Sequence, residues 1–199
     1  MSGAGALPAG GRAPPPAVRW ALDAEGWLGA AARVSSPNFD ERPSGAAIEL
    51  LVVHSISLPP GEFGGSGIID LFLNRLDSTA HPYYREIAGL KVSAHFLVRR
   101  DGELLQFVAC GKRAWHAGQS EWRGRTRCND FSIGVELEGT DALPFTDRQY
   151  DTLGALCRTL RARYPIVECL GHADIARPVG RKTDPGPGFD WARFQRTFA

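Results

Sequence analysis

The sequence predicts a single-domain α/β protein in which a mixed β-sheet is flanked by helices on both faces. A nearly continuous apolar run over 48–53 is typical of a strand buried on both faces. Residues 130–138 alternate between apolar and polar, as in a strand with two different faces. Apolar residues recur at helical spacing between Thr146 and Tyr164, and a short strand-like segment follows over 166–170. Strands, a long helix and a further strand within 199 residues indicate one domain with a mixed sheet.

Residues 1–18 are expected to be a disordered extension before a domain over 19–199. Met1 to Pro16 is rich in Gly, Ala and Pro and has no continuous apolar segment. It lacks the charged start and apolar middle of a secretory signal, and no stretch of the chain reaches the roughly 18–20 apolar residues of a membrane span. We therefore expect a cytoplasmic protein without membrane contact. The net charge of +1 provides no basic field for nucleic acid.

The cysteines are expected to be reduced thiols, as is usual in the cytoplasm. Their even number formally allows a secreted disulfide framework, but the missing signal and the wide spacing argue against one. No Cys-x-x-Cys pair occurs, so a zinc site built on cysteine is not expected. The four residues are Cys110, Cys128, Cys157 and Cys169.

The elements of the first half follow from breaks in the apolar pattern. Residues 20–33 form a short mixed segment and 35–46 a polar loop before the first buried strand. After that strand, Leu58-Pro59-Pro60-Gly61 begins a Gly-rich loop. Ser66 can then cap a helix that runs to about Leu76.

The elements of the second half are a hairpin and two further helices. Two strand-like runs, 92–99 and 103–108, flank an Asp-Gly pair, which is a hairpin signal. Thr146 can cap the long helix, which Tyr164-Pro165 ends. Asp190 can cap a last helix, whose apolar residues are Trp191, Phe194 and Phe198.

Two histidines and one aspartate form a candidate metal site. His54 and His172 each follow a strand-like segment, and strand ends are where open sheets place functional groups. Asp184 lies in a loop braced by Pro and Gly over 181–188. Two imidazoles and one carboxylate, with a vacant fourth position, are the ligand count of a catalytic zinc site. Taken alone, each residue also fits a plainer role, either a hydrogen-bonded core or loop histidine or a turn-initiating aspartate.

Lys182 and two glutamates are candidates for the chemistry beside such a metal. In an extended segment Lys182 and Asp184 point the same way, so the ammonium could stabilise an oxyanion. Glu136 and Glu138 share the polar face of one strand, and either could carry a proton from the attacking water to the leaving amine. The alternation does not choose between them. A solvated lysine and a solvated strand face are the plain alternatives.

The other histidines are expected to have structural or peripheral positions. His81 precedes a proline and is expected in a loop, and His95 is expected in the core. Trp115 and His116 stand together in a loop. There they could line a cleft that stacks sugar or peptide, or they could serve packing alone.

Six segments together carry a resemblance to a known family. In chain order they are Leu51-Val52-Val53-His54, Leu58-Pro59-Pro60-Gly61-Glu62-Phe63-Gly64, Val92-Ser93-Ala94-His95, Arg113-Ala114-Trp115-His116-Ala117-Gly118, Asn129-Asp130-Phe131-Ser132-Ile133-Gly134-Val135-Glu136-Leu137-Glu138-Gly139-Thr140-Asp141 and Arg181-Lys182-Thr183-Asp184-Pro185-Gly186-Pro187. They closely resemble AmpD-type 1,6-anhydro-N-acetylmuramyl-L-alanine amidases. These belong to a wider zinc amidase family that includes peptidoglycan-recognition proteins and phage T7 lysozyme. The resemblance runs from about Gly26 to the C-terminus.

The resemblance implies the fold of that family and a site with one zinc ion per chain. It implies Glu136, rather than Glu138, as the catalytic carboxylate and Lys182 as its electrostatic partner. The zinc ligands that it implies are His54, His172 and Asp184. Candidate substrate contacts are Ser55, Trp115, His116 and Arg127.

The implied function is hydrolysis of the amide between 1,6-anhydro-N-acetylmuramic acid and L-alanine in imported muropeptides, during cytoplasmic peptidoglycan recycling. We expect a monomer with no protein partner. One alternative is an amidase acting on intact peptidoglycan, against which the missing export signal argues. The other is a non-catalytic muropeptide-binding module; such modules typically lose a zinc ligand, whereas all three ligand residues are present here.

Three features depart from the family pattern. Ser55 stands where family members commonly have Asn after the zinc histidine, so one substrate contact differs. The run over 173–181 is about two residues longer than usual, so the loop that carries Asp184 must bulge. The Pro/Ala-rich N-terminus has no counterpart in the family.

Overall fold

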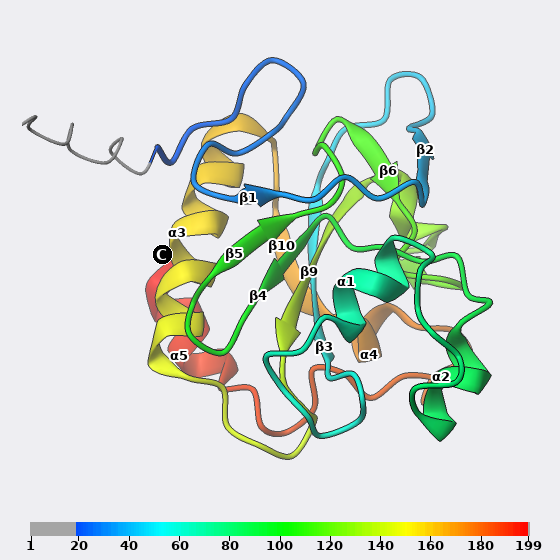
Figure 1. Ribbon diagram of the computed structural model, residues 1–199. Coiled ribbons are helices and arrows are strands. Elements are labelled where there is room, and N and C mark those ends of the chain that lie inside the picture. Colours follow the sequence, from blue (N-terminus) through cyan, green and yellow to red (C-terminus); the bar gives the residue numbers. More distant parts are fainter. Residues whose placement is uncertain (1–18, 199) are drawn as a thin grey trace, which may run out of the picture.

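A six-stranded sheet forms the centre of the protein, as the computed structural model in Figure 1 shows. The model describes residues 19–198, so the extension expected over 1–18 lies outside the described residues. The β4–β5 pair is antiparallel and the other neighbouring pairs are parallel, which confirms the predicted mixed sheet and the hairpin. In spatial order the strands are β1 (Ala32–Arg33), β5 (Leu104–Gln106), β4 (Phe96–Val98), β9 (Ser132–Glu138), β3 (Leu50–Ile56) and β10 (Glu168–Gly171).

Helices cover both faces of this sheet, as predicted (Figure 1). On one face α3 (Asp147–Arg163) packs on the sheet and against α5 (Trp191–Phe198). The opposite face carries α1 (Gly67–Phe72), α2 (Pro82–Ile87) and the short α4 (His172–Ile175). Each face therefore has its own apolar cluster, and the sheet is buried between them.

The alternation of β3 and β9 assigns residues to these two faces. Leu51 and Val53 of β3 join the cluster beneath α3, whereas Leu50 and Val52 face α4. His54 is the next residue on the α4 side. On β9 the apolar residues Ile133, Val135 and Leu137 join the α3 cluster. The alternation predicted over 130–138 therefore holds from Ser132, where the strand begins, whereas Phe131 precedes the strand and packs in the opposite cluster. The polar face of β9 is therefore turned toward the side of the sheet that carries His54, and its residues are Ser132, Gly134, Glu136 and Glu138.

The long helix begins where the sequence predicts. The Thr146 hydroxyl accepts a hydrogen bond from the Gln149 amide N–H at 3.2 Å, and the Gln149 side chain accepts one from the Thr146 amide N–H at 3.1 Å. This reciprocal pair is a capping box, which satisfies two backbone donors at the helix start. The cap of α5 is likewise confirmed, since the Arg193 amide donates to Asp190 Oδ1 at 2.8 Å.

The helix expected from Ser66 to about Leu76 is shorter than predicted. It ends at Phe72, and the Ser66 side chain makes no capping hydrogen bond. The Phe72 carbonyl accepts hydrogen bonds from side chains of an upstream segment, Ser36 Oγ at 2.6 Å and Asn38 Nδ2 at 3.1 Å. Asn74 then takes a left-handed conformation, with φ +57°, which ends the helix.

Short strand pairs and a short helix complete the fold, and the sequence did not predict them. Residues 39–41, expected within a polar loop, form β2 (Phe39–Glu41), which pairs antiparallel with β6 (Lys112–Ala114). The Arg113 guanidinium holds this ribbon through two hydrogen bonds of 2.6 Å to Asp40. The other elements are β7 (Glu121–Trp122), β8 (Arg125–Thr126) and the 3₁₀ helix η1 (Cys128–Asp130).

The structure also bears on the expected absence of a membrane-spanning segment and on the expected state of the cysteines. Among residues 19–198, no helix is long and apolar enough to cross a membrane. All four cysteines are free, and three of them are buried. The expectation that they are thiols agrees with this arrangement.

Candidate active site

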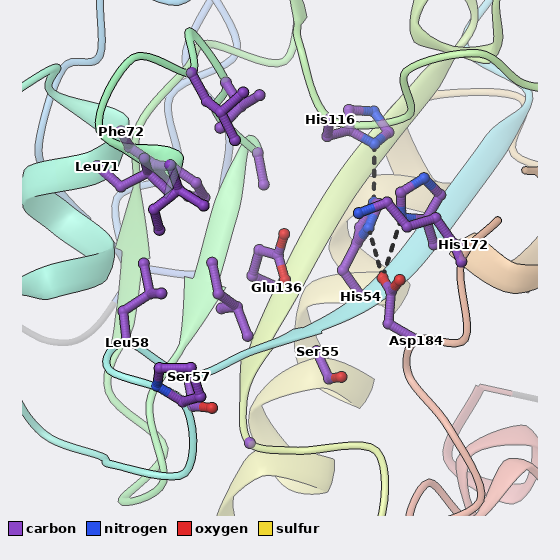
Figure 2. A pocket seen from close by; sticks show the side chains of 18 of the residues that line it. His54, Ser55, Ser57, Leu58, Leu71, Phe72, His116, Glu136, His172 and Asp184 are labelled. Atoms are coloured by element: carbon purple, nitrogen blue, oxygen red, sulfur yellow. Dashed lines mark hydrogen bonds and ion pairs between the residues drawn. The ribbon is translucent and has the colours of Figure 1, made fainter. Parts of the chain in front are cut away.

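The two predicted histidines and the predicted aspartate meet at one end of the sheet (Figure 2). His54 lies on β3, and His172 directly follows β10. Since β10 and β3 are parallel and pair Gly171 with Val53, the two imidazoles emerge side by side at the carboxyl ends of the strands. The Nδ1 atoms of both rings lie 3.1 Å from Oδ2 of Asp184.

A loop that packs closely on β10 brings Asp184 to this position. The Ala173 amide donates to the Asp184 carbonyl at 3.0 Å. A Cβ atom at Gly171 would lie 2.8 Å from Cδ of Pro185, so a side chain there would push the loop away. Within the run over 173–181, Val179 is 83% exposed, while Arg181 Nη2 donates a hydrogen bond to the Ala117 carbonyl at 3.2 Å.

Burial and mutual contact set the charges of the three groups. Burial alone would raise the pKa of Asp184, but the hydrogen bonds and charges of His172 and His54 together hold it well below its usual range. Burial, followed by the neighbouring His172, lowers the pKa of His54 to about 4. At neutral pH the cluster thus places an anionic Asp184 carboxylate beside a neutral His54 imidazole.

This donor set fits a zinc ion. One ligand atom from each residue lies within 4.8 Å of the others, and imidazole nitrogens and carboxylate oxygens can each offer a lone pair to a metal ion. Neutral imidazole and carboxylate are ligands that suit a borderline divalent cation such as zinc. The three residues could therefore hold one metal ion and leave further coordination positions open toward the pocket.

Glu136 faces the same space from the neighbouring strand (Figure 2). It is paired with His54 in the register of β9 and β3, and its side chain lines the pocket. Its Oε2 atom is buried and has no hydrogen-bond partner among residues 19–198. Burial and the nearby Asp184 raise the pKa of Glu136 well above its ordinary value, while the Lys182 ammonium acts in the opposite direction. Lys182 itself is exposed and lines the pocket.

Glu138, two residues further along β9, has different surroundings. Its Oε1 accepts hydrogen bonds from Arg99 Nη1 at 2.8 Å and from the Gly64 amide at 2.7 Å. Its Oε2 accepts from the Arg100 amide at 3.2 Å. Glu138 therefore ties the 61–65 loop to the end of β4, and neither of its oxygens is left without a partner.

The pocket around the cluster has a volume of about 540 Å³. Its metal-side wall carries the predicted polar residues, and its opposite wall is apolar. The apolar residues come from α1, α2 and the loops beside them, and they include Leu58, Leu71, Phe72, Ile87, Leu90 and Val92. Sequence analysis missed this wall because its apolar residues look like ordinary core positions until the helices are placed.

The candidate substrate contacts have different positions. Ser55 and Trp115 line the pocket, and the Ser55 hydroxyl donates to Asp141 Oδ1 at 2.9 Å. His116 also lines it, but its Nδ1 is hydrogen bonded to Nε2 of His54 at 2.9 Å. Arg127 is not among the lining residues; it lies beside Asp130 at 3.3 Å with a mostly exposed side chain.

The remaining histidines lie outside the metal cluster. His95 is fully buried in the core, as expected, and its Nδ1 accepts a hydrogen bond from the Gly134 amide at 3.0 Å. His81, expected in a loop, is the N-cap residue of α2 and accepts a hydrogen bond from the Tyr83 amide at 3.1 Å.

Asp141 is a site residue that sequence reasoning did not single out. It accepts hydrogen bonds from both Ser55 and Thr183, and its only signal in the sequence was its place in the Gly139-Thr140-Asp141 run directly after β9.

Similarity to known proteins covers most of the chain. The N-acetylmuramoyl-L-alanine amidase family model matches residues 44–187. The 1,6-anhydro-N-acetylmuramyl-L-alanine amidase AmpD of Escherichia coli (strain K12) is 59% identical over 173 residues, which cover 86% of this chain and 93% of the relative. AmpD of Salmonella typhimurium (strain SL1344) is 58% identical over 180 residues, which cover 89% of this chain and 95% of the relative.

Solved structures show the same fold. The crystal structure of a Se-Met AmpD derivative matches with a TM-score of 0.86 at 58% identity and covers 89% of this chain and 99% of that chain. A complex of the N-acetylmuramyl-L-alanine amidase AmiD from E. coli with anhydro-N-acetylmuramic acid-L-Ala-D-gamma-Glu-L-Lys matches with a TM-score of 0.56 at 29% identity, and covers 80% of this chain and 65% of that chain.

Proposed function

Because the chain belongs to the N-acetylmuramoyl-L-alanine amidase family, we propose that it hydrolyses the amide between 1,6-anhydro-N-acetylmuramic acid and L-alanine with one zinc ion held by His54, His172 and Asp184. The observation that carries the proposal is the position of Glu136 beside this ligand cluster, with a buried Oε2 that has no hydrogen-bond partner among residues 19–198. The matches with the AmpD relatives named for this activity cover 95% and 93% of those relatives' length, so the similarity is not confined to one part of them.

The residues divide the chemistry between them. A zinc ion at this site supplies a Lewis acid that polarises a carbonyl and lowers the pKa of water. Glu136 accepts the proton of the attacking water at its free Oε2 and later donates it to the leaving nitrogen. Burial and the nearby Asp184 raise the pKa of Glu136, which strengthens its carboxylate as a proton acceptor. The Lys182 ammonium stabilises the negative charge that develops on the carbonyl oxygen.

The substrate class is supported by the pocket and by the relatives. The ligand cluster and Glu136 stand on one side and an apolar wall on the other, which suits a ligand with both an amide and apolar surface. The AmiD complex contains an anhydro-muramyl tripeptide, so a family fold accommodates such a molecule. Cytoplasmic peptidoglycan recycling by a monomer is the role that we propose for this activity.

The metal assignment is tested by removing one ligand. His54→Ala should lose both bound zinc and turnover of an anhydro-muramyl tripeptide, because two remaining donors hold the ion weakly. The control is His81→Ala, which removes an imidazole that caps α2 and does not line the pocket. Metal analysis and turnover should be unchanged in the control. Full zinc occupancy in His54→Ala would contradict the assignment.

The substrate assignment is tested by a side-by-side assay. Purified zinc-loaded protein should release L-alanine-containing peptide from soluble anhydro-muropeptides much faster than from whole sacculi. The same assay with a chelator should lose both activities. Faster release from sacculi would identify an enzyme of intact peptidoglycan, and binding of muropeptide without any release would identify a binding module.

A further inference from the structure

The two ligand histidines use their second ring nitrogens in different ways. His172 Nε2 lies 3.1 Å from the Ala117 carbonyl oxygen, which can only accept a hydrogen bond. A neutral His172 therefore carries its proton on Nε2 and leaves Nδ1 as a lone-pair donor. His54 Nε2 instead meets Nδ1 of another imidazole, His116, at 2.9 Å. An imidazole nitrogen can donate or accept, so the tautomer of His54 depends on that of His116.

A built site holds His116 in place. Its Nε2 lies 3.1 Å from Oγ of Ser132, and its ring meets that of His54 edge to face, with centroids 5.1 Å apart. A Cβ atom on Gly134 would lie 2.4 Å from Cγ of His116. The bare backbone at Gly134 is therefore what leaves room for the imidazole. Ser132 and Gly134 are alternate residues on the face of β9 that also carries Glu136.

We propose that His116 is a positioning residue that makes Nδ1 of His54 the metal donor, with Ser132 as its partner. This inference rests on the proposed metal site and deepens it. In the metal-binding state His54 Nε2–H donates to Nδ1 of His116, and His116 Nε2–H donates to Ser132 Oγ. Each ring carries one proton, and the lone pair of His54 Nδ1 then points toward Asp184, beside Nδ1 of His172.

If His116 served packing alone, substitutions at this position would have a different effect on zinc affinity. If His116 only filled space, any ring of similar size on Gly134 would serve. If it orients His54, the acceptor atom at the position of Nδ1 is what counts. Partners of this kind typically change metal affinity by roughly 10–100-fold when removed. Size and acceptor can be separated, because phenylalanine keeps the ring and loses the acceptor, whereas asparagine keeps an acceptor at nearly the same place and loses the ring.

The experiment compares zinc affinity across a set of variants, by competition with a chromophoric chelator. His116→Phe should bind zinc roughly 10–100-fold more weakly than wild type, and His116→Asn should recover most of that loss. Ser132→Ala frees the outer nitrogen of His116 and should weaken zinc binding by a smaller factor. The control is His95→Gln, which removes a buried imidazole that contacts the His116 ring but not His54, and it should leave the affinity unchanged.

A second readout examines the ring directly and does not depend on activity. Nitrogen-15 NMR of the zinc-loaded wild type should show His54 with its proton on Nε2 and the metal on Nδ1. Should the His116 variants fail to fold, this spectrum and the mild Ser132→Ala variant still decide the question. Equal zinc affinity in His116→Phe and wild type, or zinc on Nε2 of His54, would overturn the inference. A wild type that binds no zinc at all would instead overturn the proposed function.

Discussion

Glu136 and Glu138 are the same residue type, two positions apart on one strand, but their surroundings differ. We propose that Glu136 carries a proton and that Glu138 stabilises the fold. Within the described part of the chain, Oε2 of Glu136 is buried beside the ligand cluster and has no hydrogen-bond partner, whereas Glu138 is hydrogen bonded to Arg99 and two backbone amides. Glu136→Gln keeps shape and packing, so we expect the variant to fold and to retain zinc. It should lose turnover by roughly 10²–10⁴, which is the usual contribution of a proton carrier. Turnover and zinc content measured on the same preparation would check this.

Glu138→Gln should show the reverse pattern. Arg99 is 9% exposed, and its partner Glu138 is 2% exposed. Neutralising one member of a buried pair leaves the other charge uncompensated, which costs about 3–5 kcal/mol. We therefore expect a clearly lower urea midpoint and a smaller loss of turnover than in Glu136→Gln. If Glu138→Gln is inactive while Glu136→Gln keeps near-full turnover, the proton carrier has been assigned to the wrong carboxylate.

His95 should make stability depend on pH. Burial, followed by the nearby Arg42 charge, lowers the pKa of His95 to about 3 in the folded protein, from 6.5 in the unfolded chain. Between these values only the unfolded state takes up the proton, so stability falls as pH drops below about 6.5, by up to about 1.4 kcal/mol per pH unit. His95→Gln removes this titration. Urea unfolding at several pH values between 7 and 4 should therefore bring the variant closer to wild type as the pH falls; a constant difference would contradict the assignment.

At the residue scale, the sequence could predict a site residue where several candidate ligands occur together in a pattern typical of a metal site. The sequence identifies His54, His172 and Asp184 because two imidazoles and one carboxylate lie beside strand ends and in a braced loop, and the fold brings them together. The pairing of His116 with His54 could not be predicted, because it depends on which loop crosses β9 and on a bare backbone at Gly134. Such contacts have no signature in spacing.

At the scale of elements, the helix caps provide a matched pair of tests. Thr146 closes a capping box on α3, whereas Ser66 stands at the start of α1 without a capping hydrogen bond. Thr146→Ala should lower stability by about 1 kcal/mol, which corresponds to roughly 2–4 °C in Tm for a chain of this size. Ser66→Ala should change Tm very little. Thermal unfolding followed by circular dichroism measures both, and equal shifts would show that the two caps do not differ in this way.

Long periodic elements were predictable and short ones were not. The helix after Thr146 and the strand over 132–138 repeat their pattern often enough to stand out from chance. The β2–β6 ribbon has three residues in each strand and depends on Arg113 reaching Asp40 from a distant part of the chain. Likewise, α1 ends early because Ser36 and Asn38 bind its last carbonyl. Long-range partners of this kind override local propensity.

At the scale of the whole molecule, the N-terminal segment offers a simple test. Among residues 19–198, those that line the active-site pocket all lie between His54 and Asp184, and the composition of Met1 to Pro16 is not that of a packed segment. We therefore expect that removal of Met1 to Pro16 leaves zinc content and turnover unchanged. The measurement is kcat and KM of the truncated and full chains on the same anhydro-muramyl tripeptide. A truncated protein that folds but loses most of its turnover would show a role for this segment.

The fold class was predictable at this scale, whereas the strand order was not. A mixed sheet with helices on both faces follows from the succession of strands and helices, and the structure has it. The placement of β9 between β4 and β3 brings Glu136 next to His54, and it depends on pairings between segments that are far apart in sequence. Only the resemblance to a family, and not periodicity, could anticipate that neighbourhood.

The polar face of β9 makes the protein sensitive to insertions and deletions of a single residue near this strand. Ser132, Gly134, Glu136 and Glu138 occupy alternate positions, about 6.6–6.8 Å apart along the strand. A one-codon deletion or insertion in the turn before β9 would shift the strand by one residue and turn all four to the opposite face at once. The proposed support of His116, the proposed proton carrier Glu136 and the Glu138 contacts to the 61–65 loop would then be lost together. The run over 173–181, by contrast, lies at the surface, where Val179 is 83% exposed. We therefore expect insertions and deletions to be tolerated in that loop but to abolish activity in the turn before β9. A point substitution on β9 would instead remove the contribution of a single residue.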